Sequence, residues 1–98
     1  MKFNQLIKKD IIFLDGGFGT ELIKKGLKPG EDSASAVFEH PQWVEEIHRS
    51  YVEAGSNVIL ANTFGANAFK LKNSPYTVEE SINKAVNIAK KAAEGTDV

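Results

Sequence analysis

Cysteine is absent from this sequence of 98 residues. Its absence excludes disulfides, thiol nucleophiles and thiolate metal ligands within the chain. The two histidines, His40 and His48, have no second ligand at the spacing that helices or hairpins use to hold a metal ion. We therefore predict that the chain itself binds no metal ion.

An excess of charge of either sign is also lacking, because 12 basic residues nearly balance 13 acidic ones and the formal net charge is −1. Such a surface does not create the positive field that attracts nucleic acid or an anionic membrane. No apolar run approaches the roughly 18 residues of a membrane span, and the first residues do not form a signal peptide. We therefore predict no nucleic-acid partner, no membrane partner and a cytoplasmic location.

The hydrophobic fraction of 42% is ordinary for one small domain. Two short apolar runs stand out, IIFL at 11–14 and VILA at 58–61, and polar residues follow each run. Continuous apolar runs are typical of parallel strands covered on both faces, although periodicity alone does not distinguish them from a buried helix. Their short length and the glycines after the first run favour strands at about 11–15 and 57–62.

Helical patterns occupy much of the remaining sequence. Gly26 suits the end of a short helix, while Pro41 and Gly55 suit the start and the end of a longer one. Within the longer segment, Trp43 and Tyr51 belong to a wide apolar stripe and are predicted to be packing residues. We predict four helices, over about 3–9, 20–25, 41–54 and 77–94.

The last of these helices has the clearest start signal. Thr77 and Glu80 form a capping box, in which the Thr hydroxyl accepts from a free backbone N–H and Glu80 reaches back to the Thr77 N–H. By contrast, residues 28–40 have turn composition without a period and predict a long loop.

The order strand, helices, strand, helix predicts an α/β fold with two parallel strands joined by a right-handed crossover. Two such strands with flanking helices are a part of an α/β sheet or barrel, and a complete (βα)8 barrel typically needs about 250 residues. Residues 96–98 resemble the approach to a third strand. We therefore expect the chain to be the first part of a larger sheet or barrel and to be an incomplete barrel by itself.

Asp15 ends the first predicted strand and is followed by a glycine-rich turn, residues 16–19. Leu22 stands where a dinucleotide fingerprint needs its third glycine, and no Gly-Lys-Ser/Thr follows to cradle phosphate. A nucleotide site is therefore not predicted. Asp15 is interpreted equally well as a cap of the following helix or as a residue of a ligand site.

Asn62 ends the second predicted strand, so parallel neighbours would place Asp15 and Asn62 side by side. A carboxylate beside an amide suits a ligand that has an ammonium group and a second hydrogen-bonding group, such as an amino acid. Alternatively, the Asn62 side chain bonds its own backbone in the turn.

Three linked motifs lie between residues 15 and 67: DGGFGTEL at 15–22, IHRSYVEAGS at 47–56 and ILANTFGAN at 59–67. In order and spacing they resemble the start of the homocysteine S-methyltransferase family, which includes the homocysteine-binding module of cobalamin-dependent methionine synthase and the betaine-dependent enzyme. The resemblance implies a (βα)8 TIM barrel, with this chain supplying the first two βα units, parallel strands and flanking helices.

In that family, a zinc ion held by three cysteines of later strands binds the homocysteine sulfur, and the resulting thiolate attacks a methyl donor to give methionine. On the matching positions, the resemblance implies that Asp15 contacts the amino group of homocysteine. The resemblance also implies that five further positions shape or line the same pocket: Gly16, Gly17, Asn62, Thr63 and Phe64.

The chain departs from the family pattern because it carries none of the zinc-binding cysteines. We therefore expect a truncated methyltransferase that binds no zinc and transfers no methyl group alone, and whose methyl donor is recognised outside this portion. Exposed sheet edges and apolar helix faces predict self-association. The alternative is a non-catalytic α/β fragment that acts through self-association or assembly with other barrel parts.

Overall fold

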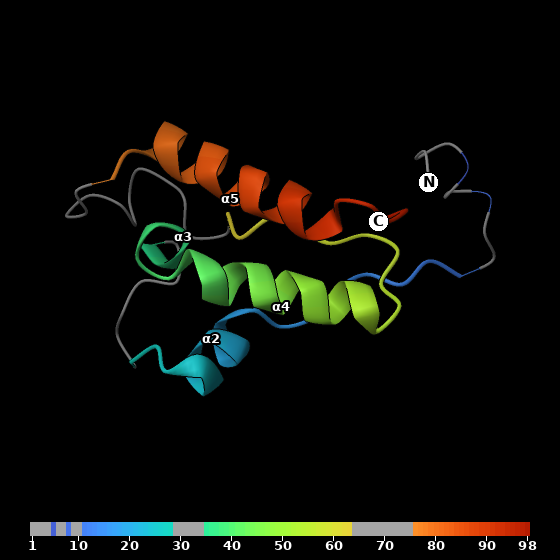
Figure 1. Ribbon diagram of the computed structural model, residues 1–98, viewed down its shortest axis with the longest axis horizontal. Coiled ribbons are helices and arrows are strands. Elements are labelled where there is room, and N and C mark those ends of the chain that lie inside the picture. The colour runs from blue at the N-terminus through green and yellow to red at the C-terminus, as the bar shows by residue number, and fades with distance from the viewer. Residues whose placement is uncertain (1–4, 6–7, 9–10, 29–34, 64–75) are drawn as a thin grey trace.

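The structure is a computed structural model that describes residues 5, 8, 11–28, 35–63 and 76–98. Its described residues contain four helices: α2 (Gly19–Lys25), α3 (Ala36–Glu39), α4 (Pro41–Glu53) and α5 (Val78–Ala93). The two long helices, α4 and α5, pack side by side, and α3 contacts both of them (Figure 1). The short helix α2 packs against α4 on the side away from α5.

The prediction of two regular strands is wrong. Within the described residues, 11–15 and 57–62 are extended segments joined by a single parallel bridge between Leu14 and Val58. The Asp15 N–H donates to the Val58 carbonyl at 3.1 Å, and the Val58 N–H donates to the Phe13 carbonyl at 3.2 Å. Parallel pairing is stable mainly inside a covered sheet of several strands, so two isolated segments keep the predicted direction without forming a ladder.

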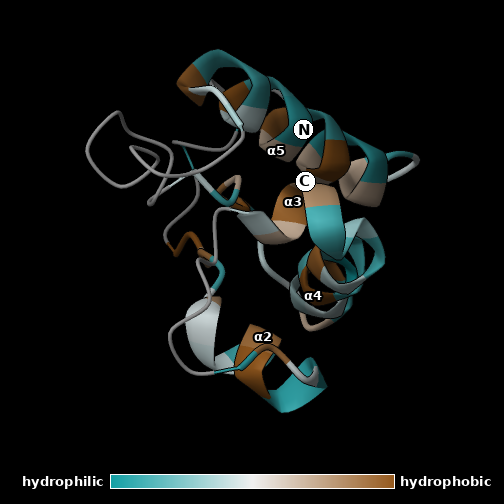
Figure 2. Cartoon of the chain, turned by 90° about the vertical axis from the view of Figure 1, so that its left-hand side faces the viewer, coloured by the Kyte–Doolittle hydropathy of each residue, from teal (hydrophilic) through white to brown (hydrophobic). Residues whose placement is uncertain are grey.

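Apolar side chains from all four helices meet between α4 and its neighbours. Apolar residues recur at helical spacing along α4 and α5, so each helix has an apolar side, which faces inward, and a polar side, which faces outward (Figure 2). Burying these side chains supplies the main driving force for the fold. The buried cluster consists of Leu22, Leu27, Ala36, Val37, Val44, Ile47, Ala85 and Ile88.

Local signals explain where these helices begin and end. Pro41 occupies the first turn of α4, where its missing N–H has no partner to lose. Gly26 follows α2 with φ +124°, a backbone conformation that only glycine adopts without strain. Its N–H donates to the Ile23 carbonyl. At the start of α5, the Thr77 hydroxyl accepts from the Glu80 N–H at 3.1 Å, while the Glu80 carboxylate accepts from that hydroxyl instead of from the Thr77 N–H.

The structure differs from the prediction over residues 36–39 and describes little of the predicted first helix. The prediction of a loop over 28–40 is wrong for residues 36–39, which form α3 because Ala36 and Val37 are buried against α4 and α5. The predicted helix over 3–9 lies outside the described residues, apart from Gln5 and Lys8. None of the helices in the described part of the chain has the length and hydropathy needed to cross a membrane.

Candidate functional site

Asp15 lies where the first extended segment turns toward α2. Its Oδ2 accepts a hydrogen bond from the Leu60 N–H at 3.0 Å, which extends the pairing of the two segments beyond their bridge. The residue that caps α2 is Phe18, and no side chain caps that helix. The interpretation of Asp15 as a helix cap is therefore wrong, and the carboxylate instead joins the ends of the two segments.

Asp15 and Asn62 line one pocket of about 170 Å³ at the carboxyl ends of the extended segments. Asn62 is almost fully buried, with 8% of its surface exposed. The turn after it is closed by a hydrogen bond from the half-buried Thr63 N–H to the Ala61 carbonyl at 2.8 Å. The pocket is lined by Asp15, Gly16, Phe18, Leu60, Ala61 and Asn62.

The other predicted site residues are less closely tied to the pocket. Gly17 does not line it, although its backbone immediately follows the pocket residue Gly16. Thr63 follows Asn62 without lining the pocket. Phe64 lies outside the described residues. Of the six predicted positions, the structure therefore brings Asp15, Gly16 and Asn62 together.

The glycine turn rests on a side chain of α4. The Tyr51 hydroxyl donates to the Gly17 carbonyl at 2.5 Å. A Cβ at Gly16 would lie 3.1 Å from Tyr51 Oη and 3.2 Å from Tyr51 Cε1, so a larger residue fits only if the Tyr51 ring shifts by a few tenths of an ångström. The apolar stripe of the sequence predicted Tyr51 as a packing residue, and nothing in the sequence indicated this hydrogen bond.

His48 lies one turn before Tyr51 on α4 and is fully buried. Its ring packs against the Phe18 ring with centroids 5.0 Å apart, and neither Nδ1 nor Nε2 has a hydrogen-bond partner in the described part of the chain. Burial lowers the pKa of His48, an effect that the negative charge of Asp15 opposes. The neutral imidazole therefore packs against Phe18, a residue of the pocket lining, and the sequence did not predict this contact.

Zinc does not fit the residues that are present. The chain has no cysteine, and the residues that the structure describes include no group of three side chains able to hold a metal ion. The His40 ring, for example, stacks on Trp43 at a centroid distance of 3.8 Å. The described residues of this site therefore do not support a reaction that needs a metal ion bound by them.

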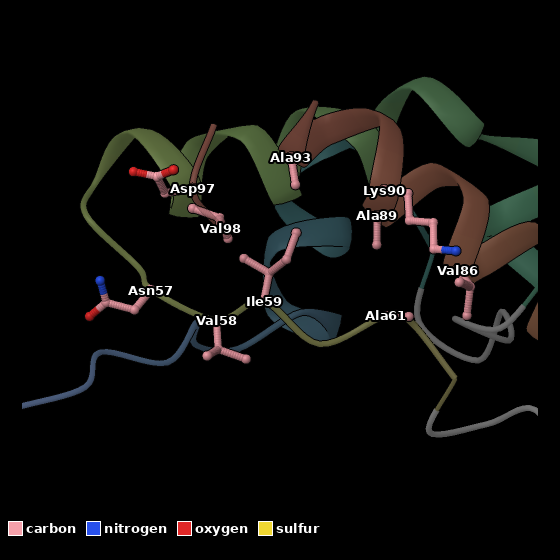
Figure 3. Close-up of a pocket in the computed structure, with 10 residues that line it drawn as sticks. All are labelled: Asn57, Val58, Ile59, Ala61, Val86, Ala89, Lys90, Ala93, Asp97 and Val98. Atoms are coloured by element: carbon pink, nitrogen blue, oxygen red, sulfur yellow. The ribbon is translucent and has the colours of Figure 1, made fainter. Parts of the chain in front are cut away.

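A second, larger pocket of about 360 Å³ lies between the second extended segment and α5. Figure 3 shows Ile59 extending from that segment toward α5, while the neighbouring Val58 points to the other side. On the helix, Ala89 and Ala93 leave the space open. This pocket is mainly apolar, and it was not predicted from the sequence.

These features define a class of protein. Parallel extended segments, a helical crossover and a small pocket beyond their carboxyl ends are features of α/β proteins, whose ligands commonly bind at that edge. The sequence matches the family model described as homocysteine S-methyltransferase over residues 12–98. The chain belongs to the homocysteine S-methyltransferase family, which confirms the resemblance predicted from its three motifs.

Individual relatives agree with this assignment. Betaine–homocysteine S-methyltransferase 1 of Bos taurus is 38% identical over 95 residues, which cover 90% of this chain and 23% of that protein. The protein of the same name from Sus scrofa is 37% identical, with 90% and 34% covered. The chain thus spans about a quarter to a third of these curated relatives.

Solved structures extend the similarity to the fold. The metallated form of the homocysteine methyltransferase MmuM from Escherichia coli superimposes with a TM-score of 0.80 at 30% identity, covering 94% of this chain and 34% of that one. Its oxidised form gives the same TM-score and identity, with 91% and 32% covered. The described helices and the bridged segments therefore have the arrangement of one part of a homocysteine methyltransferase.

Proposed function

We propose that this chain is the N-terminal part of a homocysteine S-methyltransferase and forms the first two βα units of its (βα)8 barrel. In this proposal it supplies the side of the pocket that holds the amino-acid end of homocysteine. The observation that carries the proposal is the pocket shared by Asp15 and Asn62 at the carboxyl ends of the two segments. The family and the coverage of its relatives support the same assignment.

Asp15 is the proposed partner of the substrate ammonium group. One of its oxygens already accepts from the Leu60 N–H, and an ionised carboxylate has about four lone-pair sites, so acceptor capacity remains for a ligand. The bond to Leu60 also fixes the direction of the carboxylate, which reduces the entropy lost on binding. Gly16 and Gly17 allow close approach of the backbone, and Asn62, Thr63 and Phe64 complete the proposed lining.

The proposed reaction is transfer of a methyl group to the homocysteine sulfur, which gives methionine. The described residues place no cysteine and no metal-binding group beside the pocket. We therefore propose that the 98 residues take part in substrate binding and do not catalyse methyl transfer alone. The methyl donor and the groups that activate the sulfur belong to other parts of the complete enzyme.

Titration of ¹⁵N-labelled chain with homocysteine tests the proposal. Saturable shifts of the Gly16, Ala61 and Asn62 amide signals are expected, and added zinc should leave the titration unchanged. The D15N variant keeps an oxygen that can accept from the Leu60 N–H but loses the charge, so it should fold normally and lose the response. E79Q, on the exposed first turn of α5, is the matched control and should bind as the parent chain does.

The second candidate function is assembly without catalysis. It is favoured by apolar side chains that remain exposed on the two extended segments, including Phe13 at 60% and Leu60 at 61%. Exposed apolar patches and unpaired strand edges promote association with other chains. Absence of any homocysteine response, together with a concentration-dependent mass, would favour this candidate over the first.

A further inference from the structure

We propose that Tyr51 is a positioning residue for the substrate pocket, acting from α4 on the glycine turn that follows Asp15. The inference rests on the proposed function, because that function makes the turn a part of the homocysteine site. Tyr51 itself does not line the pocket shared by Asp15 and Asn62. Its effect on a ligand is therefore exerted through the backbone of the turn.

The contacts of Tyr51 join two successive residues of the turn. The hydroxyl donates to the Gly17 carbonyl at 2.5 Å, across 34 positions of sequence. The ring fills the space beside Gly16, where an added Cβ would lie only 3.1 Å from Oη. One side chain thus fixes both the direction of a carbonyl and the distance between the turn and α4.

The hydroxyl keeps its proton, as this role requires. Loss of solvent around the ring raises the pKa of Tyr51 above its ordinary value, and the negative charges of Glu21 and Asp15 raise it further, against a smaller opposing effect of Lys24. At neutral pH, Tyr51 is therefore a hydrogen-bond donor to Gly17.

A second side chain of α4 supports the next residue of the same turn. His48 lies three positions before Tyr51, on the same side of the helix, and its buried ring packs against Phe18. Phe18 lines the pocket and caps α2. The face of α4 that carries His48 and Tyr51 therefore contacts three consecutive residues, 16–18, directly after Asp15.

The two successive glycines of the turn explain why its backbone needs support from Tyr51. Gly16 and Gly17 have no side chains to limit their backbone conformations. Fixing two glycines in one conformation therefore costs more conformational entropy than fixing two other residues. A ligand that binds at Asp15 must meet the entropy cost of ordering the turn unless the protein has ordered it beforehand. The Tyr51 hydroxyl and ring hold the turn before the ligand arrives.

The Y51F variant tests the inference, because it removes the hydroxyl and keeps the ring. We expect faster amide hydrogen exchange and shifted signals at residues 16–18, and homocysteine affinity weaker by on the order of fivefold. Y76F is the matched control, since Tyr76 stacks on Phe38 away from the turn. It should leave both the turn signals and the affinity at parent values, whatever its effect on urea unfolding.

The outcomes separate this inference from the proposed function. Unchanged exchange and signals at residues 16–18 in Y51F would overturn the positioning role, even if the parent chain binds homocysteine. Altered turn signals in a chain that shows no homocysteine response would instead contradict the proposed function and leave Tyr51 as the residue that orders the turn. Equal losses of affinity in Y51F and Y76F would also reject the role, because they would reflect stability alone.

Discussion

His48 is a buried base that no described group satisfies. Its pKa in the folded chain is lower than the ordinary value of 6.5, because burial disfavours the charged ring more than Asp15 favours it. Unfolding exposes the ring, so the unfolded chain takes up the proton first as pH falls. The contribution of neutral His48 to stability is present above pH 6.5 and is lost as pH falls from there toward the lowered pKa.

We therefore expect urea unfolding to show less stability at pH 5.5 than at pH 7.5, and the H48Q variant to show a smaller loss between these two conditions. Glutamine keeps a polar amide at the site but does not titrate. H40Q is the control, because His40 stacks on Trp43 and is not fully buried. Equal losses in H48Q and in the parent chain would contradict the assignment.

Two glycines of the same turn should respond differently to alanine. At Gly16 a methyl group would press on the Tyr51 ring, and we expect G16A to destabilise the chain by about 1–3 kcal/mol. At Gly19, the first residue of α2, the methyl group meets nothing within 4 Å. G19A should therefore be neutral or stabilise the chain by up to about 1 kcal/mol, since alanine loses less entropy in a helix. Urea unfolding of both variants measures the contrast, and a destabilised G19A would show that the turn tolerates no change at all.

Helices are the elements that local sequence predicts best here. The capping box at residues 77–80 marks the start of α5, where the Thr77 hydroxyl accepts from the Glu80 N–H. Its side chains nevertheless pair differently from the expected box, because the Glu80 carboxylate accepts from the hydroxyl itself. The backbone bond is local and follows from residue type, whereas the rotamer of Glu80 is settled only in the folded helix.

The cap can be tested by substitution. T77A removes the acceptor of the Glu80 N–H and should destabilise the chain by about 1 kcal/mol, with less helical circular dichroism before the main transition. T77S keeps the hydroxyl and serves as the matched control. Equal stability of T77A and T77S would mean that α5 is held by its packing on α4 and not by its cap.

At the scale of the whole molecule, several large apolar side chains remain exposed to solvent. Ile11, Phe13 and Leu14 of the first segment are 65%, 60% and 59% exposed, and among the described residues a single bridge joins this segment to the second one. In a complete barrel such residues would be covered by neighbouring strands and helices. Alone, the chain is expected to bury them against other copies of itself.

Sedimentation velocity over a range of concentrations measures this association. We expect a mass that rises with concentration, and a smaller rise in F13K, because a charge on the exposed segment disfavours burial. I23K is the control, since Ile23 is a comparably exposed apolar residue on α2, outside the extended segments. A folded chain that remains monomeric at every concentration would contradict the expectation.

The sequence by itself determined the features that depend on neighbours along the chain. Apolar spacing, Pro41 and the residues after each helix predicted segments now occupied by α4 and α5. Three motifs identified the family, and the order of elements predicted that Asp15 and Asn62 approach one another, as they do in one pocket. Each of these inferences needs only local preferences or the direction of two parallel segments.

Tertiary structure alone decided the rest. The predicted strands became one bridge, because a parallel ladder needs neighbours that local sequence does not show. Residues 36–39 are helical because the core buries them, and burial also leaves the His48 ring nitrogens without a partner among the described residues. The hydrogen bond from Tyr51 to Gly17 joins positions 34 residues apart, so it exists only when the packing of α2 on α4 brings the turn and the helix together.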